Sequence, residues 1–384
     1  MRVPSFLVIV AVVGVSAAVA CSGGGAKPSD GQASLDARPD NAPASDAVDR
    51  PGNPGGNDAG MGGSGGDAPV GPLDAADGVA PGNDAVGPSD GSDVAPPAAR
   101  TVGEIYCPPG VLPAADPLPA DRLATLVPIA PPGGISFLEG PLWIADRGVL
   151  LFSEWNAGHR ILQLTPPQAV EVFMPATGSN GLALAPDGKT FLMVTEVPSA
   201  GVSRVSLADK SVQKVVVNFN GQGFMQPNDL VVRADGIIYF TDYAAGRLYR
   251  RALDGTLTMV SSLPRSNGVG LSPDEKTLYL NADTHTVKYP LAADGTAGAG
   301  TDLATGLKGA DGLAIDCAGN VYIAQNMGAA VVVMSAAGAK LGEITGLPMV
   351  VTNAAFGGAD RKTLYITTSS ALYTIPIQIP GLPY

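Results

Sequence analysis

Short apolar runs recur in pairs along residues 120–380 of this 384-residue chain. In each pair, a run such as LALA (182–185) is followed by a turn of Pro, Asp or Gly, and then by a second run rich in β-branched and aromatic residues. Two such runs joined by a tight turn are typical of a β-hairpin. The pattern therefore predicts an all-β protein built from hairpins.

One hairpin design occurs six times, and each copy opens with a polar residue that is usually followed by a small one. Several hairpins are followed by further strand-like runs, such as VQKVVV (212–217), so a unit contains up to four strands. Repeats of about 40–50 residues with four strands each indicate a β-propeller, and six units predict six blades. The opening residues are Glu139, Asn180, Asn228, Asn267, Asp311 and Asn353.

The run LATLVPI (123–129) precedes the first hairpin and also has the pattern of a strand. It is expected to pair into the last blade and close the ring, which would protect an open sheet edge. The predicted propeller occupies residues 101–384. Five aromatic residues lie within hairpin strands and are expected to pack between blades: Trp143, Tyr239, Tyr279, Tyr322 and Tyr365.

The six opening residues, called the ring residues below, are expected to meet at one mouth of the central channel. Equivalent positions in a propeller lie at the same height and the same distance from the axis. All six side chains offer an oxygen atom, and none is Lys or Arg. Carboxylates and carboxamides facing one small volume would be unsatisfied without a cation. Oxygen ligands without Cys or His favour a hard ion, Ca²⁺ first and then Mg²⁺ or Mn²⁺.

Other interpretations of single ring residues remain open. The Asn-Gly pairs at 180–181 and 267–268 could form type I′ turns, although each hairpin already has a turn several residues later. Asn180 and Asn353 could cap loop backbones, and Glu139 could be a surface charge.

Five segments carry a resemblance to a known family: EGPLW, PNDLVVRADGIIYFTD, NGVGLSPDEKTLYL, DGLAIDCAGNVYIA and TNAAFGGADRKTLYIT. In this order they resemble the gluconolactonase and regucalcin (senescence-marker-protein) family of six-bladed β-propeller hydrolases, over about residues 120–378. Diisopropylfluorophosphatase is a more distant relative. The resemblance implies one divalent cation, held by Glu139, Asn228, Asn267 and Asp311. It leaves Asn180 and Asn353 as candidate residues of the substrate pocket.

The resemblance also implies a reaction, because family members hydrolyse lactones of sugar acids or related cyclic esters. The cation, Ca²⁺ or alternatively Mg²⁺, Mn²⁺ or Zn²⁺, would polarise the ring carbonyl. Asp311 would be both ligand and general base. Phosphotriesterase activity is an alternative that would use the same ion site. A propeller that binds a ligand or serves as a scaffold without catalysis is a second alternative.

Three departures from the family pattern concern the substrate side of the site. Gln226 stands where the animal relatives have an Arg. The segment TDYAAGRLYR lacks the long loop that follows the third hairpin of bacterial gluconolactonases, and Glu196-Val197 replaces a Glu-His pair. The ion site is therefore expected to be retained, while the substrate need not be gluconolactone.

Residues 1–20 have the pattern of a bacterial signal peptide: a basic residue at position 2, an apolar run, and small residues before Cys21. The segment Ala18-Val19-Ala20-Cys21 resembles a lipobox, which predicts a lipidated Cys21 and a location at the cell envelope, anchored to a membrane through lipid. The alternative is an ordinary signal peptide with Cys21 as a bystander.

Residues 21–100 are predicted to be a disordered linker. The stretch lacks Phe, Trp and Tyr and consists mainly of Gly, Pro, Ala, Asp and Ser, so it offers too little apolar surface to offset the entropy of ordering. The whole chain has a formal charge of −12 and no basic stripe, which argues against a nucleic-acid partner. The expected partner is a small-molecule substrate, and the expected state is a monomer.

Cys107 and Cys317 are the two thiols left in an exported domain, so the sequence allows either a disulfide or two separate buried thiols. His159 and His285 are the only histidines. A Ser-His-Asp hydrolase is not supported, because the chain has no G-x-S-x-G motif.

Overall fold

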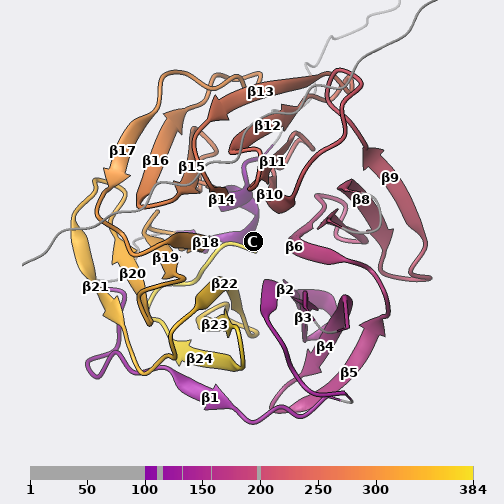
Figure 1. The fold of residues 1–384 in the computed structure, drawn as a ribbon. Coiled ribbons are helices and arrows are strands. Elements are labelled where there is room, and N and C mark those ends of the chain that lie inside the picture. The colour runs from indigo at the N-terminus through magenta and orange to yellow at the C-terminus, as the bar shows by residue number, and fades with distance from the viewer. Residues whose placement is uncertain (1–99, 110–115, 132, 157, 197–199, 384) are drawn as a thin grey trace, which may run out of the picture. The chain divides into compact units, whose positions relative to one another are not determined.

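The computed structural model describes residues 100–109, 116–131, 133–156, 158–196 and 200–383. These residues form six four-stranded antiparallel sheets that surround a central axis as the blades of a propeller (Figure 1). The all-β, six-bladed prediction is therefore confirmed. The expected signal peptide, the lipidation site at Cys21 and the linker lie outside the described residues.

The strands of each of the first five blades run outward from the axis in chain order. Blade 1 contains β2 (Leu138–Ile144), β3 (Val149–Glu154), β4 (Arg160–Thr165) and β5 (Ala169–Met174), with a 3₁₀ turn, η1 (Ala145–Arg147), between β2 and β3. Blade 2 contains β6 (Ser179–Leu184), β7 (Thr190–Thr195), β8 (Gly201–Ser206) and β9 (Val212–Val216). Blade 3 contains β10 (Pro227–Val232), β11 (Ile238–Asp242), β12 (Arg247–Arg251) and β13 (Leu257–Ser262).

The remaining blades follow the same plan. Blade 4 contains β14 (Ser266–Leu271), β15 (Thr277–Ala282), β16 (His285–Pro290) and β17 (Thr301–Ala304). Blade 5 contains β18 (Ala310–Ile315), β19 (Val321–Gln325), β20 (Ala330–Met334) and β21 (Lys340–Ile344). Blade 6 contains β22 (Val351–Gly357), β23 (Thr363–Thr368), β24 (Leu372–Pro376) and, as its outer strand, β1 (Thr125–Val127).

The outer strand of blade 6 comes from the other end of the domain, as the run at 123–129 predicted. β1 pairs antiparallel with β24, in the register Thr125↔Thr374 and Leu126↔Tyr373. This pairing joins the beginning of the propeller to its last blade and leaves β24 without an open edge.

Apolar side chains fill the space between neighbouring blades. Trp143 of blade 1 stacks on Tyr365 of blade 6 with ring centroids 5.8 Å apart. Tyr322 of blade 5 packs edge-on against Phe356 of blade 6 at 5.1 Å. All five aromatic residues expected between blades are buried. Burial of a large apolar side chain stabilises a fold by roughly 1.5–3 kcal/mol, so these contacts hold the inner strands at fixed positions around the axis.

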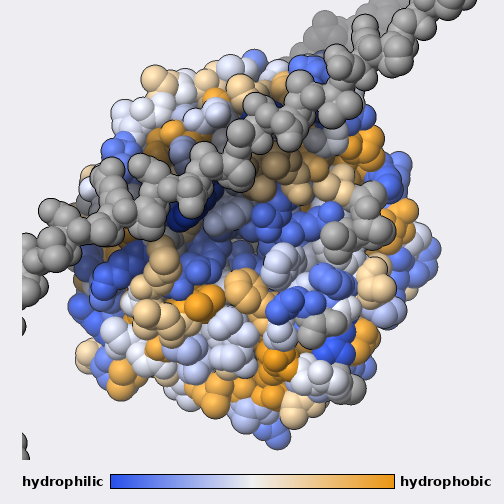
Figure 2. Space-filling view, viewed as in Figure 1, coloured by the Kyte–Doolittle hydropathy of each residue, from blue (hydrophilic) through white to orange (hydrophobic). Residues whose placement is uncertain are grey.

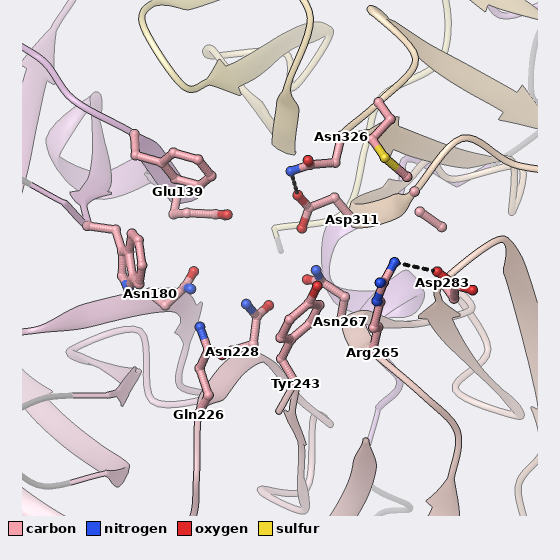
Figure 3. Close-up of a pocket in the computed structure, with 15 residues that line it drawn as sticks. Glu139, Asn180, Gln226, Asn228, Tyr243, Arg265, Asn267, Asp283, Asp311 and Asn326 are labelled. Carbon is pink, nitrogen blue, oxygen red and sulfur yellow. Dashed lines mark hydrogen bonds and ion pairs between the residues drawn. The ribbon is translucent and has the colours of Figure 1, made fainter. Parts of the chain in front are cut away.

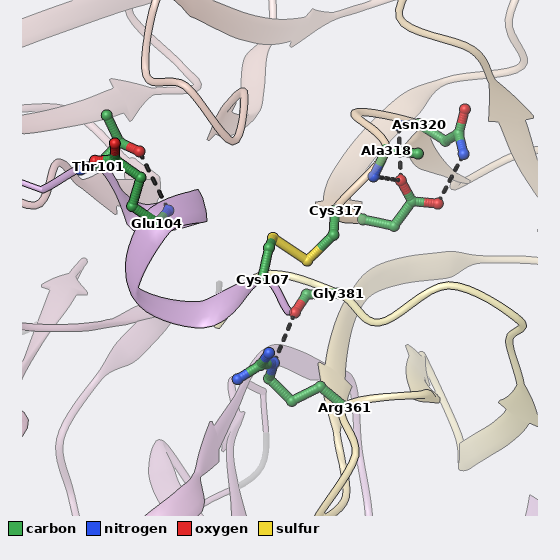
Figure 4. The surroundings of a disulfide bond; sticks show 9 residues. Thr101, Glu104, Cys107, Cys317, Ala318, Asn320, Arg361 and Gly381 are labelled. Carbon is green, nitrogen blue, oxygen red and sulfur yellow. Dashed lines mark hydrogen bonds between the residues drawn. A yellow bond between two sulfur atoms is a disulfide. The ribbon is translucent and has the colours of Figure 1, made fainter. Parts of the chain in front are cut away.

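The end of the channel where the inner strands finish is covered by the two ends of the domain. A short helix, α1 (Val102–Tyr106), begins at a capping box in which Thr101 and Glu104 bond each other's backbone N–H (Figure 4). The N–H of Gly103 donates to Pro273 O at 2.8 Å, in the turn between β14 and β15. Near the C-terminus, Arg361 Nε donates to Gly381 O at 3.1 Å.

A disulfide between Cys107 and Cys317 joins α1 to the turn between β18 and β19 (Figure 4). This bond is one of the two outcomes that the sequence left open. It lies at the end of the channel opposite the first residues of the inner strands. No helix among the described residues is long and apolar enough to cross a bilayer.

Candidate active site at the mouth of the channel

The inner strands of blades 1 to 5 begin irregularly, and this irregularity positions the ring residues. In β10, for example, the ladder with β11 has the pair Pro227↔Asp242 and resumes only at Leu230↔Phe240. Two residues leave the ladder, which is a β-bulge that bends the strand and turns side chains. The first of the two is the ring residue in blades 2 to 5: Asn180, Asn228, Asn267 and Asp311. Glu139 of blade 1 directly precedes the equivalent bulge.

These five ring residues line a cavity of about 350 Å³ at the mouth of the channel. Figure 3 shows their side chains converging on one space from four sides. In a space-filling view, mainly hydrophilic residues surround the hollow at the centre of the face (Figure 2). All five side chains are buried, with exposed fractions between 3% and 8%. The sequence repeat therefore located most of the pocket floor.

Asn353, the sixth predicted ring residue, does not line the cavity. The first pair of β22 with β23 is Val351↔Thr368, so the position equivalent to the other ring residues is Thr352. The Thr352 hydroxyl donates to Leu138 O at 2.6 Å and thereby links blade 6 to blade 1. Asn353 lies one position further along, where its Oδ1 accepts from the N–H of Ala354 at 2.8 Å. The prediction was wrong here because it matched residue types and not the register of the ladder.

Two further positions in blades 1, 3, 4 and 5 contribute to the wall of the cavity. The first position lies two residues before the ring residue and contributes Phe137, Gln226, Arg265 and Gly309. The second directly follows the second strand and contributes Trp155, Tyr243, Asp283 and Asn326. Backbone hydrogen bonds join the two positions, as in Trp155 N to Phe137 O (2.9 Å) and Asn326 N to Gly309 O (2.8 Å). Apart from Gln226, the residues of this wall were not predicted from the sequence as site residues.

Three carboxyl groups are buried close together at the centre of the site. Burial and the nearby charges of Asp311 and Asp229 raise the pKa of Glu139 well above its usual value. Burial, with Asp229 nearby, also raises the pKa of Asp311 to about 7, against hydrogen bonds from Asn326 and Asn267 that lower it. Burial likewise raises the pKa of Asp229 to about 7. Desolvated acids at this spacing disfavour one another's charged form.

Asp229 was not predicted to be a site residue, although it directly follows the ring residue Asn228. It occupies the second place in the bulge of β10, where its Oδ1 accepts from the N–H of Leu230 at 2.9 Å. Asn353 also acts as a hydrogen-bond partner of its side chain and lowers its pKa. Its carboxyl group therefore lies beside the ring residues and adds to the negative potential there.

The cavity wall contains little positive charge to balance these carboxylates. Among the described residues that line it, Arg265 is the one cation, and its Nη1 pairs with Asp283 Oδ1 at 3.0 Å. Within the same described part of the chain, His, Cys, Asp and Glu side chains form no cluster of three that could bind a metal by themselves. A cation at the centre would therefore depend on the amide oxygens of Asn228 and Asn267 as well as on Glu139 and Asp311.

Two residues that follow second strands orient ring residues in their own blades. Asn326 Nδ2 donates to Asp311 Oδ2 at 2.6 Å (Figure 3). Asn180 Nδ2 donates to Glu196 Oε1 at 3.0 Å. Glu196 also accepts side-chain hydrogen bonds from Trp155 and Gln226, while burial raises its pKa. Each of these two contacts restrains the rotation of a ring side chain.

Asn180 carries an unsatisfied acceptor. Its Oδ1 atom is buried and has no hydrogen-bond partner among the described residues. An ionised carboxylate only accepts hydrogen bonds, so the atom of the Asn180 amide that faces Glu196 is the nitrogen. The amide oxygen, Oδ1, therefore lies on the side of the amide away from Glu196. A buried acceptor without a donor costs free energy, which points to a ligand or cation as the missing partner.

Neither His159 nor His285 lines the cavity. His159 is nevertheless close enough to Glu196 for its charge to lower the pKa of that carboxyl group. His285 begins β16 and pairs with Asp302 at 3.3 Å on the exposed part of blade 4.

The fold and the site together define a six-bladed propeller with an oxygen-lined pocket at the mouth of its channel. The family described as "SMP-30/Gluconolactonase/LRE-like region" matches residues 137–370. The chain belongs to this family. The resemblance inferred from the five motifs is thereby confirmed.

Three relatives illustrate the relationship. The chain is 30% identical over 279 residues to a gluconolactonase of Zymomonas mobilis, with 61% of this chain and 77% of the relative covered. It is 28% identical over 246 residues to the pentonolactonase XacC of Haloferax volcanii, covering 60% and 81%. The structure of a Xanthomonas campestris gluconolactonase superposes with a TM-score of 0.58 and 26% identity, covering 70% of this chain and 99% of that one.

Proposed function

We propose that this protein is a lactone hydrolase that depends on a divalent cation. The lactonases among its relatives support the reaction class. The observation that carries the proposal for this chain is the oxygen-lined cavity, in which Glu139 and Asp311 are buried beside amide oxygens with one paired arginine in the wall.

The residues of the site fit a hard divalent cation. Burial and neighbouring carboxylates raise the pKa values of Glu139 and Asp311, as expected of carboxylates that lack a positive partner. Glu139, Asn228, Asn267 and Asp311 would hold the cation, and Ca²⁺ matches oxygen-only ligation best. When bound, the cation supplies a Lewis acid that polarises the lactone carbonyl and stabilises negative charge on its oxygen.

The residues of the chain supply positioning and proton transfer. Asp311 accepts a hydrogen bond from Asn326 on Oδ2, and its carboxylate would take a proton from an attacking water as general base. Asn180, Gln226 and Tyr243 line the cavity with groups that can bind substrate hydroxyls. Phe137 and Trp155 pack together, with ring centroids 5.6 Å apart, and offer an apolar surface for the ring of the lactone.

A lactone panel tests this proposal. The purified protein is assayed with five- and six-membered sugar lactones, with and without a chelator, beside Asp311→Asn and the surface control Glu171→Gln. We expect hydrolysis that the chelator abolishes, that Asp311→Asn lowers by about 10²–10⁴-fold, and that the control retains. Hydrolysis that persists in chelator would refute the metal requirement, and no hydrolysis of any lactone would refute the reaction class.

We further propose that Cys21 is lipidated, because the segment Ala18-Val19-Ala20-Cys21 resembles a lipobox. Incorporation of labelled fatty acid into the wild type but not into Cys21→Ser tests the anchor; equal labelling of both would refute it.

A further inference from the structure

A second set of equivalent positions lies on the second strand of each blade, opposite the start of the bulge in the first strand. In blade 1 this position is Ser153, which the ladder pairs with the ring residue Glu139. It is the last residue but one of each second strand, and all six side chains there have an exposed fraction of 0%. The six residues are Ser153, Val194, Thr241, Asn281, Ala324 and Thr367.

The polar members of this set bond the main chain at the bulges. Ser153 Oγ donates to Asn180 O of the next blade at 2.7 Å, and Thr367 Oγ1 donates to Asn353 O of its own blade at 3.2 Å. Bulges leave main-chain groups outside the ladder, and buried main-chain groups need partners. The set therefore supports the part of each strand from which a ring side chain projects.

Asn281 of blade 4 makes contact with two carbonyl groups of the next blade. Its Nδ2 donates to Asp311 O at 2.7 Å and to Gly312 O at 3.3 Å, and these two residues form the bulge of β18. Carbonyl oxygens only accept hydrogen bonds, so the amide nitrogen is the atom that faces them. On its other side, Asn281 Oδ1 accepts from the hydroxyl of Thr286 at 2.7 Å. The amide of Asn281 is therefore held in one orientation.

Asp311 is consequently restrained at both its main chain and its carboxylate. Asn281 of the preceding blade bonds the main chain, whereas Asn326 bonds the carboxylate at 2.6 Å (Figure 3). Asn281 itself does not line the cavity. It can therefore influence the site only through the residues that it contacts.

The fold does not require a polar residue at this position. Val194 in blade 2 and Ala324 in blade 5 occupy it with side chains that cannot form a hydrogen bond. Asn281 is the one amide among the six, and its partner is the residue to which the proposed function assigns both metal binding and proton transfer. Building on the proposed lactone hydrolysis, we propose that Asn281 is a positioning residue, which fixes the main chain of Asp311 and thereby the approach of its carboxylate to the cation and the attacking water.

Asn281→Ala tests this role, because it introduces the residue that blade 5 has at the same position. Calorimetry of the purified, chelator-treated protein with Ca²⁺ and steady-state kinetics with a sugar lactone are measured side by side. We expect the affinity for Ca²⁺ and kcat each to fall about tenfold or more, as for the loss of other partners that orient metal ligands. KM should change less than about threefold, because Asn281 does not touch the cavity. Asn281→Ser, whose hydroxyl can make the bond that Ser153 makes in blade 1, should recover part of both losses.

Thr367→Val is the matched control. It removes a hydroxyl at the same position and the same depth in blade 6, whose ring position, Thr352, lies outside the cavity. The control should lower Tm but leave the affinity for Ca²⁺ and kcat within about twofold of the wild type. Thr286→Val is a second, milder variant, which frees the amide of Asn281 and should weaken Ca²⁺ binding about threefold or more.

Three results would overturn the proposal. The first is wild-type Ca²⁺ affinity and kcat in folded Asn281→Ala, or wild-type affinity in Thr286→Val if Asn281→Ala does not fold. The second is an equal loss of both quantities in Thr367→Val, which would show a merely structural role. The third is a rise in KM without a fall in kcat. A wild type that binds Ca²⁺ and hydrolyses no lactone would refute the reaction alone, because the difference in Ca²⁺ affinity between wild type and variant still tests the position of Asp311.

Discussion

Asn326 Nδ2 donates a 2.6 Å hydrogen bond to Oδ2 of Asp311. The donor follows the second strand of blade 5, and the acceptor lies in the bulge of the first strand. The contact thus restrains the rotation of the Asp311 carboxylate, which also accepts a side-chain hydrogen bond from Asn267.

Asn326 is therefore expected to act as a positioning residue. Asn326→Ala should lower kcat about tenfold or more, because a carboxylate that rotates freely spends less time in the reactive geometry. KM and the number of bound cations per chain should change little. Steady-state kinetics together with metal analysis separate these effects, and a variant that loses its cation would show that Asn326 supports binding and not orientation.

Glu196 is expected to organise the opposite part of the cavity, since Asn180, Trp155 and Gln226 all bond its carboxylate. Glu196→Ala frees three donors at once and should raise KM for a sugar lactone by about tenfold, with a smaller effect on kcat. The surface substitution Glu171→Gln is the control. Unchanged KM in a folded Glu196→Ala protein would contradict this role.

The metal-free protein should lose stability as the pH rises from 5 to 8. Burial raises the pKa values of Asp229 and Asp311 from 3.8 to about 7. Their contribution to stability is therefore complete only when the pH is below their pKa in the unfolded state. That contribution is lost as the pH passes through about 7. Added Ca²⁺ should raise Tm more at pH 8 than at pH 5, because the ligands must be deprotonated. Melting curves in chelator and in Ca²⁺ measure this; an equal shift at both pH values, or a shift retained in Asp311→Asn, would count against the site.

The disulfide should stabilise the propeller without affecting the cavity. It joins residues 210 positions apart in the sequence, and closing so long a loop contributes up to about 5 kcal/mol in the chain-entropy model. Cys107→Ala with Cys317→Ala should therefore lower Tm markedly while kcat/KM at 25 °C stays within about twofold. Denaturant titration and kinetics test both parts, and a folded variant without activity would show that the two ends of the channel are coupled.

The repeat allowed the fold and the pocket floor to be predicted, because one pattern recurred at positions that a propeller makes equivalent. It failed at Asn353, since a shift of one residue in the ladder of β22 places Thr352 at the ring position. Residue type alone could not reveal that shift.

The wall of the cavity was missed for a different physical reason. Arg265 and Asp283 are 18 residues apart in the sequence, and only the pairing of β14 with β15 brings them together. The repeat did contain a signal, because Gln226 and Arg265 both lie two residues before an Asn of the ring. Comparing that position across the blades would have identified Arg265, whereas the ion pair itself required the structure.

The proposed function depends on one divalent cation held by Glu139 and Asp311 together with Asn228 and Asn267. The most direct test is a calorimetric titration of the chelator-treated protein with Ca²⁺, run in parallel on Glu139→Gln, Asp311→Asn and the control Glu171→Gln. We expect one site per chain in the wild type and the control, with binding lost or weakened by at least about tenfold in the two site variants. Binding of equal strength in all four proteins, or none in the wild type with Ca²⁺, Mg²⁺, Mn²⁺ or Zn²⁺, would contradict it.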